Sequence, residues 1–135
     1  MDVKNFLAKI LKGNLGENIP QAVKDAFNKQ FDNPLNPEWV KTMEYYEAVF
    51  YKNELEHLAR FNSKGNLENL KVNMPLDKIP ENITNTARKH GELMNAIAIH
   101  RRTAVNYELI VRDKNLIRYF LLLDLSGEVI EKEKL

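Results

Sequence analysis

The chain carries one pattern of residues twice, 60 to 62 positions apart. Ile19-Pro20 and Ile79-Pro80 each begin a helical pattern, which is followed by strand-like residues and then by a four-residue turn that ends in glycine. The spacing grows only from 60 at the prolines to 62 at the turn glycines, as expected if insertions fall in loops. Because one copy is too small to bury its own apolar face, we expect the two copies to share a core.

Length and composition restrict the class of protein. A chain of 135 residues is long enough for one domain with a real core, or for two tightly fused half-domains, and too short for two independent domains. Its 44% apolar and 29% charged content is typical of a soluble globular protein, and its net charge of +1 argues against a dedicated nucleic-acid binder. The absence of cysteine excludes disulfides and thiolate sites. No apolar run approaches the roughly 20 residues that a membrane span requires.

Changes in hydrophobic period predict the order of helices and strands. An amphipathic helix is expected over residues 3–12, with Val3, Phe6 and Ile10 on one side. The fold class predicted from the rest is α+β, with two tandem units that each have one helix and a four-stranded antiparallel meander, the helices lying on one sheet face. The expected divisions are residues 1–17 for the N-terminal helix and linker, 18–75 for the first unit and 76–135 for the second, in one compact domain.

The alternation of residues in the strands predicts which side chains lie under the helices. Phe50 and Phe61 are expected beneath the first helix, over residues 19–31. Val111 and Leu123 are expected beneath the second helix, over residues 79–91. Segments 62–65 and 124–127 begin with Asn or Asp and end with Gly, which predicts two hairpins with a type I turn closed by a left-handed glycine.

These residues resemble the PepSY-like group of bacterial beta-lactamase-inhibitor-like proteins, over about residues 18–135. The first copy matches through Ile19-Pro20, Trp39, Tyr46 to Phe50 and Phe61 to Gly65, and the second through Ile79-Pro80, Tyr107 to Leu109 and Asp124 to Gly127. The resemblance implies tandem helix-plus-sheet units and no cofactor. It also implies a role in binding or inhibiting a protein rather than in catalysis.

The histidines and acidic residues do not indicate an enzyme. His57, His90 and His100 lie in three different predicted elements and lack the spacing of a metal site. The acidic residues of the first hairpin alternate with lysines, which is typical of a solvated strand surface. These acidic residues are Glu44, Glu47, Glu54 and Glu56, and the lysines are Lys41 and Lys52. We therefore expect no metal, no cofactor and no catalytic residue.

Positive charge is concentrated in the second half of the chain. It comes from Arg101, Arg102, Arg112, Lys114 and Arg118. No glycine-rich phosphate loop and no RNA-binding signature accompanies these residues, so we expect no nucleic-acid partner.

The sheet face that points away from the helices is too apolar to be fully solvated. Aromatic and arginine side chains contribute large contact area at interfaces, so we predict a protein interface there. Its candidate residues are Trp39, Tyr45, Val49, Tyr51, Leu58, Arg60, Ile110, Phe120 and Leu122. Two occupants are open at this point: the N-terminal helix of the same chain, or a partner, which includes a second copy of the chain in a homodimer.

The predicted function is a non-catalytic, protein-binding or inhibitor-like module with an unidentified protein partner. The alternative is a small-ligand-binding protein, or an enzyme, with a pocket between helix and sheet that is lined by His57 and Tyr119. Residues 1–7 do not form a secretory signal, so the expected location is the cytoplasm, or the periplasm or exterior if a signal segment has been removed.

Overall fold

The computed structural model describes residues 14–15 and 18–135. This part of the chain divides into two compact units, one within the residues up to Val72 and one formed by Asn73–Leu135. The helix predicted over residues 3–12 lies outside the described residues. The predicted divisions after residues 17 and 75 stay predictions.

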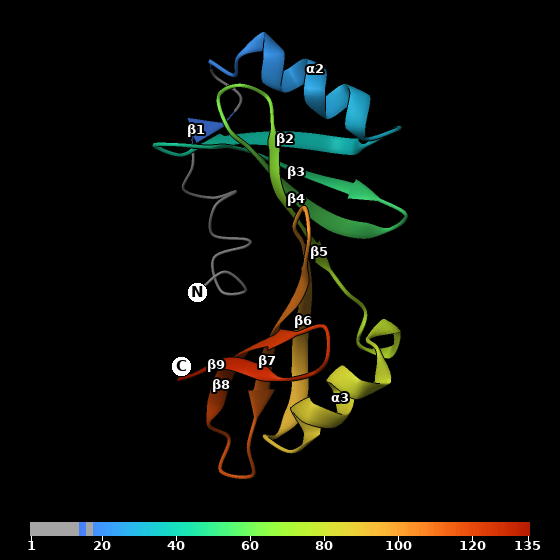
Figure 1. Cartoon of the computed structure of the whole chain (residues 1–135), viewed down its shortest axis with the longest axis vertical. Coiled ribbons are helices and arrows are strands. Elements are labelled where there is room, and N and C mark those ends of the chain that lie inside the picture. The colour runs from blue at the N-terminus through green and yellow to red at the C-terminus, as the bar shows by residue number, and fades with distance from the viewer. Residues whose placement is uncertain (1–13, 16–17) are drawn as a thin grey trace. The chain divides into compact units, whose positions relative to one another are not determined.

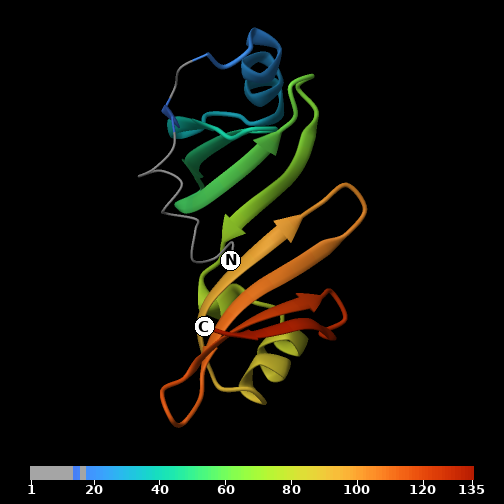
Figure 2. The ribbon, with the colours of Figure 1, turned by 90° about the vertical axis from the view of Figure 1, so that its left-hand side faces the viewer.

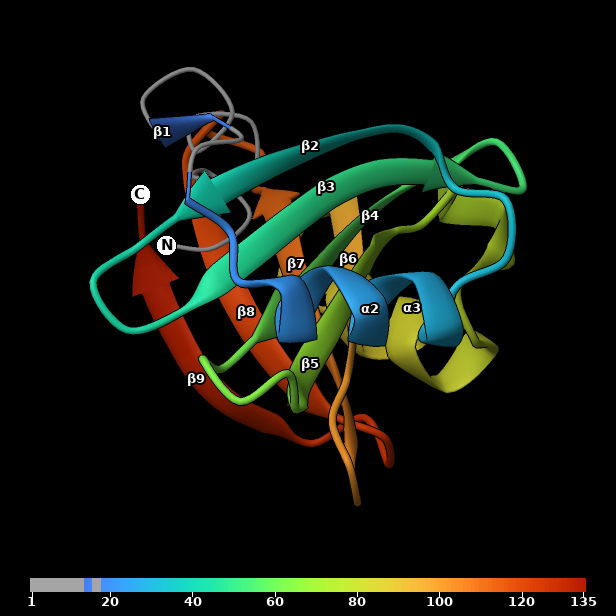
Figure 3. The ribbon, with the colours of Figure 1, turned by 90° about the horizontal axis from the view of Figure 1, so that it is seen from above.

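In the first unit a helix lies across one face of antiparallel strands (Figures 1 and 3). Its elements are β1 (Asn14–Leu15), α2 (Gln21–Gln30), β2 (Leu35–Lys41), β3 (Tyr46–Lys52), β4 (Leu55–Phe61) and β5 (Leu67–Asn73). From β2 to β5 each strand pairs antiparallel with the strand before it, and β1 pairs with β2. Helix α2 begins after Pro20, whose backbone φ of −57° already suits a helix and whose missing N–H is not needed there.

The core of the first unit is aromatic. Val23 and Phe27 of α2 are buried against Phe50 of β3 and Phe61 of β4. The ring of Phe27 lies 5.0 Å from that of Phe50 and 6.4 Å from that of Phe61, centroid to centroid, both edge-on. Edge-to-face packing of this kind adds to the hydrophobic gain from burial. The predicted burial of Phe50 and Phe61 under the first helix is confirmed.

The second unit also places a helix on one face of antiparallel strands, as Figure 2 shows. Its elements are the 3-10 turn η1 (Leu76–Lys78), α3 (Glu81–Arg88), β6 (Glu92–His100), β7 (Val105–Arg112), β8 (Arg118–Asp124) and β9 (Val129–Lys134). Ile83 and Ala87 of α3 are buried in one cluster with Leu109, Val111 and Leu123. The predicted burial of Val111 and Leu123 under the second helix is therefore confirmed as well.

The fold class predicted from the sequence is wrong. The prediction was two units of one helix and four strands after an N-terminal helix. The described residues are instead mostly antiparallel strands with only two short α-helices, and they include the short strand β1 and the 3-10 turn η1, which the prediction lacks. The start of β2 also differs from the sequence pattern, in which Pro34 and Pro37 indicate a break before the strand-like residues that begin at Trp39. The structure begins β2 already at Leu35, and the pairing of β2 with β3 is irregular between Leu35 and Glu38. Proline is tolerated in a strand at such an irregularity because one ladder hydrogen bond is already missing.

Both predicted hairpin turns are confirmed. The amide of Gly65 donates to the carbonyl of Asn62 at 3.1 Å, and that of Gly127 donates to Asp124 at 3.0 Å. The two glycines have φ of +86° and +92°, in the region that glycine adopts without steric cost. A Cβ atom on Gly65 would lie 2.9 Å from the carbonyl oxygen of Ala22, so this turn also packs closely against α2.

Replacing Gly65 with alanine should therefore destabilise the protein by about 2 kcal/mol, from the left-handed backbone and the contact with α2. Gly127→Ala should cost less, about 1 kcal/mol, because its nearest backbone atom would be 3.3 Å away. Urea denaturation of both variants, with exposed Ser63→Ala as control, measures the difference. Equal stabilities for the two glycine variants would show that the contact with α2 does not matter.

Candidate functional site

The face of the first unit opposite α2 gathers four of the nine side chains predicted for an interface, Val49, Tyr51, Leu58 and Arg60. Because Phe50 and Phe61 point toward α2, their neighbours in β3 and β4 point to the other side. We call this side the distal face and define it by Val40, Glu47, Val49, Tyr51, Leu58 and Arg60. Its cross-strand pairs are direct: Glu47 lies opposite Arg60, and Val49 lies opposite Leu58.

Arg60 is held in place at one end of the distal face. Its Nε donates to Oε2 of Glu47 at 3.1 Å, and its guanidinium carbon lies 4.8 Å from the ring centroid of Tyr45. The Glu47 side chain is fully buried, whereas the Arg60 side chain is 25% exposed. The backbone of Tyr45 is fixed in turn by hydrogen bonds to Thr42. A carboxylate and an aromatic face together restrict the guanidinium to one orientation.

Tyr51 lies at the other end of the distal face and is 44% exposed. Its hydroxyl donates to Oε2 of Glu56 at 3.2 Å, and the strand register places Leu35, which is 62% exposed, directly opposite it. The charge of Glu56 and its hydrogen bond raise the pKa of Tyr51, with Glu38 adding to the effect. Burial raises the pKa of Glu56, which the hydrogen bond from Tyr51 partly offsets. This end therefore combines an exposed aromatic ring, an exposed leucine and carboxylates.

The remaining predicted interface residues are placed differently. Trp39 faces α2 instead of the distal face, because it pairs with Ala48 and its ring lies 5.2 Å from that of Phe27. In the second unit Ile110 lies opposite Phe120 on the face away from α3. Phe120 is buried and Ile110 is half-buried. Leu122 is half-buried opposite Glu108, which is itself buried.

Sequence reasoning missed the exposed Leu35 and the buried Glu47. Leu35 stands between two prolines, which hid the strand that contains it. The prediction of a solvated strand surface for Glu47 is wrong, because it groups Glu47 with acidic residues that alternate with Lys41 and Lys52, whereas Glu47 itself is fully buried. One signal for its burial was available in the sequence. Glu47 and Arg60 lie on the same predicted face of neighbouring strands, where they can form an ion pair, and the structure pairs them directly.

The surroundings of His57 and His90 are those of residues that stabilise the fold. His57 stacks on Phe50 with ring centroids 5.2 Å apart, and its Nδ1 lies 2.8 Å from the carbonyl oxygen of Leu55. Burial lowers the pKa of His90, and the nearby charges of Lys132 and Lys89 lower it further. In the part of the chain that the structure describes, no three His, Asp or Glu side chains are grouped as metal ligands would be.

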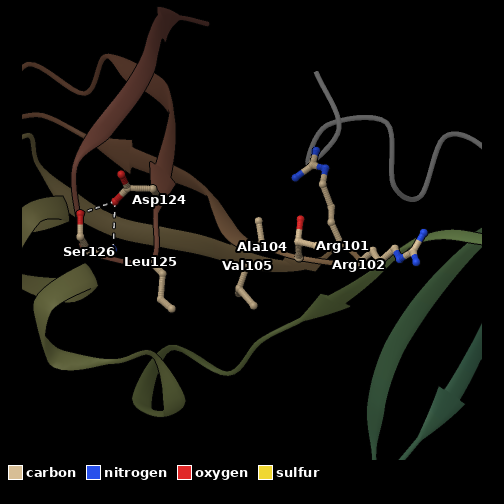
Figure 4. A pocket seen from close by; sticks show the side chains of 8 residues that line it. Arg101, Arg102, Ala104, Val105, Asp124, Leu125 and Ser126 are labelled. Carbon is tan, nitrogen blue, oxygen red and sulfur yellow. Dashed lines mark hydrogen bonds between the residues drawn. The ribbon is translucent and has the colours of Figure 1, made fainter.

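A surface pocket of about 580 Å³ lies in the second unit, beside two hairpin turns (Figure 4). The β6–β7 turn contributes Arg101 and Arg102, and the β8–β9 turn contributes Asp124, Leu125 and Ser126. Asp124 stabilises the turn in which it lies, because its Oδ1 accepts hydrogen bonds from the Ser126 hydroxyl and from the backbone amides of Ser126 and Glu128. These bonds, the one from the Ser126 hydroxyl first, lower the pKa of Asp124.

This pocket is not the one that the sequence suggested. The predicted pocket lies between helix and sheet and is lined by His57 and Tyr119, neither of which lines the pocket at the turns. In Figure 4 the arginine side chains extend away from Asp124 and Ser126, so the polar groups do not converge on one point. The small-ligand alternative stays a prediction.

Comparison with known proteins identifies the fold. No protein-family model and no curated protein matches the chain. A DUF2874 family protein from Bacteroides uniformis matches with a TM-score of 0.78 and 20% identity, over 85% of this chain and 88% of that one. A DUF2874 family protein from Bacteroides ovatus matches with a TM-score of 0.79 and 19% identity, over 88% and 89% of the two chains. A BLIP-like protein from Bacteroides fragilis matches with a TM-score of 0.74 and 14% identity, over 86% of each chain.

These likenesses, all at or below 20% identity, show a shared fold. The beta-lactamase-inhibitor-like part of the predicted resemblance is supported by the BLIP-like neighbour, and the PepSY-like name is not confirmed. In the described residues, none of the helices has both the length and the apolar character that crossing a bilayer requires. The chain is therefore similar in fold to BLIP-like and DUF2874 family proteins.

Proposed function

We propose that the chain is a non-catalytic, inhibitor-like module that binds a protein through the two ends of the distal face of its first unit, at Tyr51 and Arg60. The residues between these ends, Val40, Glu47, Val49 and Leu58, are buried. The observation that carries the proposal is the fixed arrangement of Arg60 between the carboxylate of Glu47 and the ring of Tyr45. The BLIP-like structural neighbour supports a binding role for this fold.

A fixed arginine and two tyrosines suit protein recognition. Arginine and tyrosine are enriched among the residues that dominate binding energy, because they contribute large contact area. A side chain that is already held in one orientation loses less conformational entropy when the partner arrives. Val49 and Leu58, both buried, form a rigid base between the Arg60 end and the Tyr51 end of the distal face.

The chemistry at the two ends indicates what the partner presents. At the Tyr51 end, the ring and the carboxylates of Glu56 and Glu38 suit a lysine or arginine of the partner, and exposed Leu35 suits an apolar side chain beside it. At the other end, the donors of Arg60 that Glu47 does not use suit a carbonyl or carboxylate oxygen.

Binding of a panel of purified serine beta-lactamases, measured by calorimetry, tests this proposal. For an enzyme that binds the unmodified chain, Tyr51→Ala should weaken binding about tenfold or more, or ~1.4 kcal/mol, because it removes the exposed ring. Asn28→Ala, on the exposed side of α2, is the matched control and should leave binding unchanged.

Sedimentation of the chain alone gives the other arm of the test. If the partner is a second copy of the chain, Tyr51→Ala should shift the dimer toward monomer, whereas Asn28→Ala should not. Equal binding and equal self-association by the parent chain and Tyr51→Ala would contradict the use of the distal face.

A further inference from the structure

Three hairpin turns of this chain share one hydrogen-bond pattern. They span residues 62–66, 113–117 and 124–128. In each, the side chain of the first residue accepts hydrogen bonds from the amides two and four positions later. In each, the amide of the fourth residue also donates to the carbonyl of the first, at 3.0 to 3.1 Å. The three turns are therefore direct structural references for one another.

The fourth residue has a left-handed backbone in all three turns but is glycine in only two. Gly65 and Gly127 have φ of +86° and +92°, and Leu116 has φ of +65°. A leucine in this region is a steric outlier, because its Cβ approaches the following carbonyl oxygen. The turn at residues 113–117 therefore keeps a strained residue where the chain elsewhere uses glycine.

Burial does not compensate for this strain. The Leu116 side chain is 70% exposed, so it contributes little to the core. Backbone strain that folding does not require is typical of residues kept for function. Nothing in the turn's own hydrogen bonding needs a leucine, since the other two turns make the same bonds with glycine.

The exposed charges beside Leu116 have one sign. Lys114 and Arg118 are both exposed. Arg112 is engaged with Glu92 at 2.9 Å, and the carboxylate of Asp113 accepts two amides of the turn. The tip thus presents an apolar side chain between two cationic ones.

We propose that Leu116 is an anchor that inserts into a leucine-sized apolar pocket of a partner protein, and that acidic groups at the rim of that pocket contact Lys114 and Arg118. This inference rests on the proposed protein-binding function, but it does not depend on the distal face. An exposed apolar side chain on a rigid hairpin enters such a pocket with little loss of conformational entropy.

The first arm of the test needs no partner. Leu116→Gly removes the strain, so its melting temperature should rise by about 3 °C. Leu125→Ala is the matched control, because Leu125 is also exposed, at 58%, on a hairpin turn but has no positive φ. A fall in melting temperature for Leu116→Gly would show that the leucine serves the fold and would overturn the proposal.

The second arm is photo-crosslinking in a lysate of the source organism, with a diazirine analogue of leucine at position 116 and, separately, at position 125. We expect a protein adduct at position 116 that maps to apolar residues next to Asp or Glu. An excess of the unmodified chain should prevent formation of this adduct, whereas an excess of the Leu116→Gly variant should not. The proposal would be overturned if the probes at positions 116 and 125 gave the same adduct in the same yield. It would also be overturned if the Leu116→Gly variant reduced the yield at position 116 as much as the parent chain does.

Competition by Tyr51→Ala separates this inference from the proposed function of the distal face. If Tyr51→Ala competes as well as the parent chain while Leu116→Gly does not, the anchor is correct and the distal face is not used. If Leu116→Gly competes and Tyr51→Ala does not, the distal face is used and the anchor is wrong.

Discussion

Phe61→Ala should lower the free energy of unfolding by about 3 to 5 kcal/mol, as expected for removal of a buried phenylalanine ring from a packed core. Phe61 is 1% exposed, and its ring lies between those of Phe27 and Trp39, at 6.4 and 6.2 Å. The cavity left by the ring adjoins the rings of Phe27 and Trp39, which cannot collapse into it without leaving their own contacts.

Chemical denaturation of the purified variant measures this loss. Lys64→Ala, on the exposed turn that follows Phe61, is the control and should change stability by less than about 0.5 kcal/mol. A loss below about 1 kcal/mol for Phe61→Ala would mean that α2 does not depend on the aromatic cluster for its docking.

Local structure could be predicted from the sequence because it depends on short-range rules. In a strand every second side chain points to the same face, so the alternation of residues alone places Phe50 and Phe61 on the face under α2. The two glycine turns could be predicted because a hairpin turn that begins with Asn or Asp requires a left-handed residue at its fourth position, which glycine adopts without strain. Neither prediction requires knowledge of which strands pair.

The sheet order could not be predicted in this way. Pairing between strands depends on backbone hydrogen bonds, which carry no residue code, so the repeated pattern did not predict that β1 pairs with β2 or that β2 begins at Leu35. The prolines around Leu35 reinforced the error, because proline disfavours a regular strand but is compatible with an irregular one. The turn at residues 113–117 was missed for a related reason: it has leucine where the rule expects glycine.

The candidate site shows the same division. Alternation places Tyr51, Leu58 and Arg60 on one face, and the structure has them there. Trp39 was chosen because tryptophan is common at interfaces, without regard to its phase, and the pairing of Trp39 with Ala48 directs it toward α2. A role of these residues in binding stays a proposal, since burial and register do not identify a partner.

Arg60→Ala is expected to destabilise the protein by about 3 kcal/mol, because it leaves the fully buried carboxylate of Glu47 without its hydrogen bond from the guanidinium. We expect the lower end of the usual range for a broken buried ion pair, since the Arg60 side chain is 25% exposed and its charge is partly screened by water. The same variant also removes the contact with the ring of Tyr45.

A double-mutant cycle with Glu47→Gln separates the charge effect from the loss of packing. Gln is neutral and has nearly the shape of Glu, so Arg60→Ala in the Glu47→Gln background should cost about 1 to 2 kcal/mol less than in the parent chain. Urea denaturation of the parent, the two single variants and the double variant gives the coupling energy. If Arg60→Ala costs the same in both backgrounds, Arg60 stabilises the distal face by packing on Tyr45 and not by its pairing with Glu47. The fixed guanidinium would then depend on the aromatic ring, and Tyr45→Ala should release it while Glu47→Gln should not.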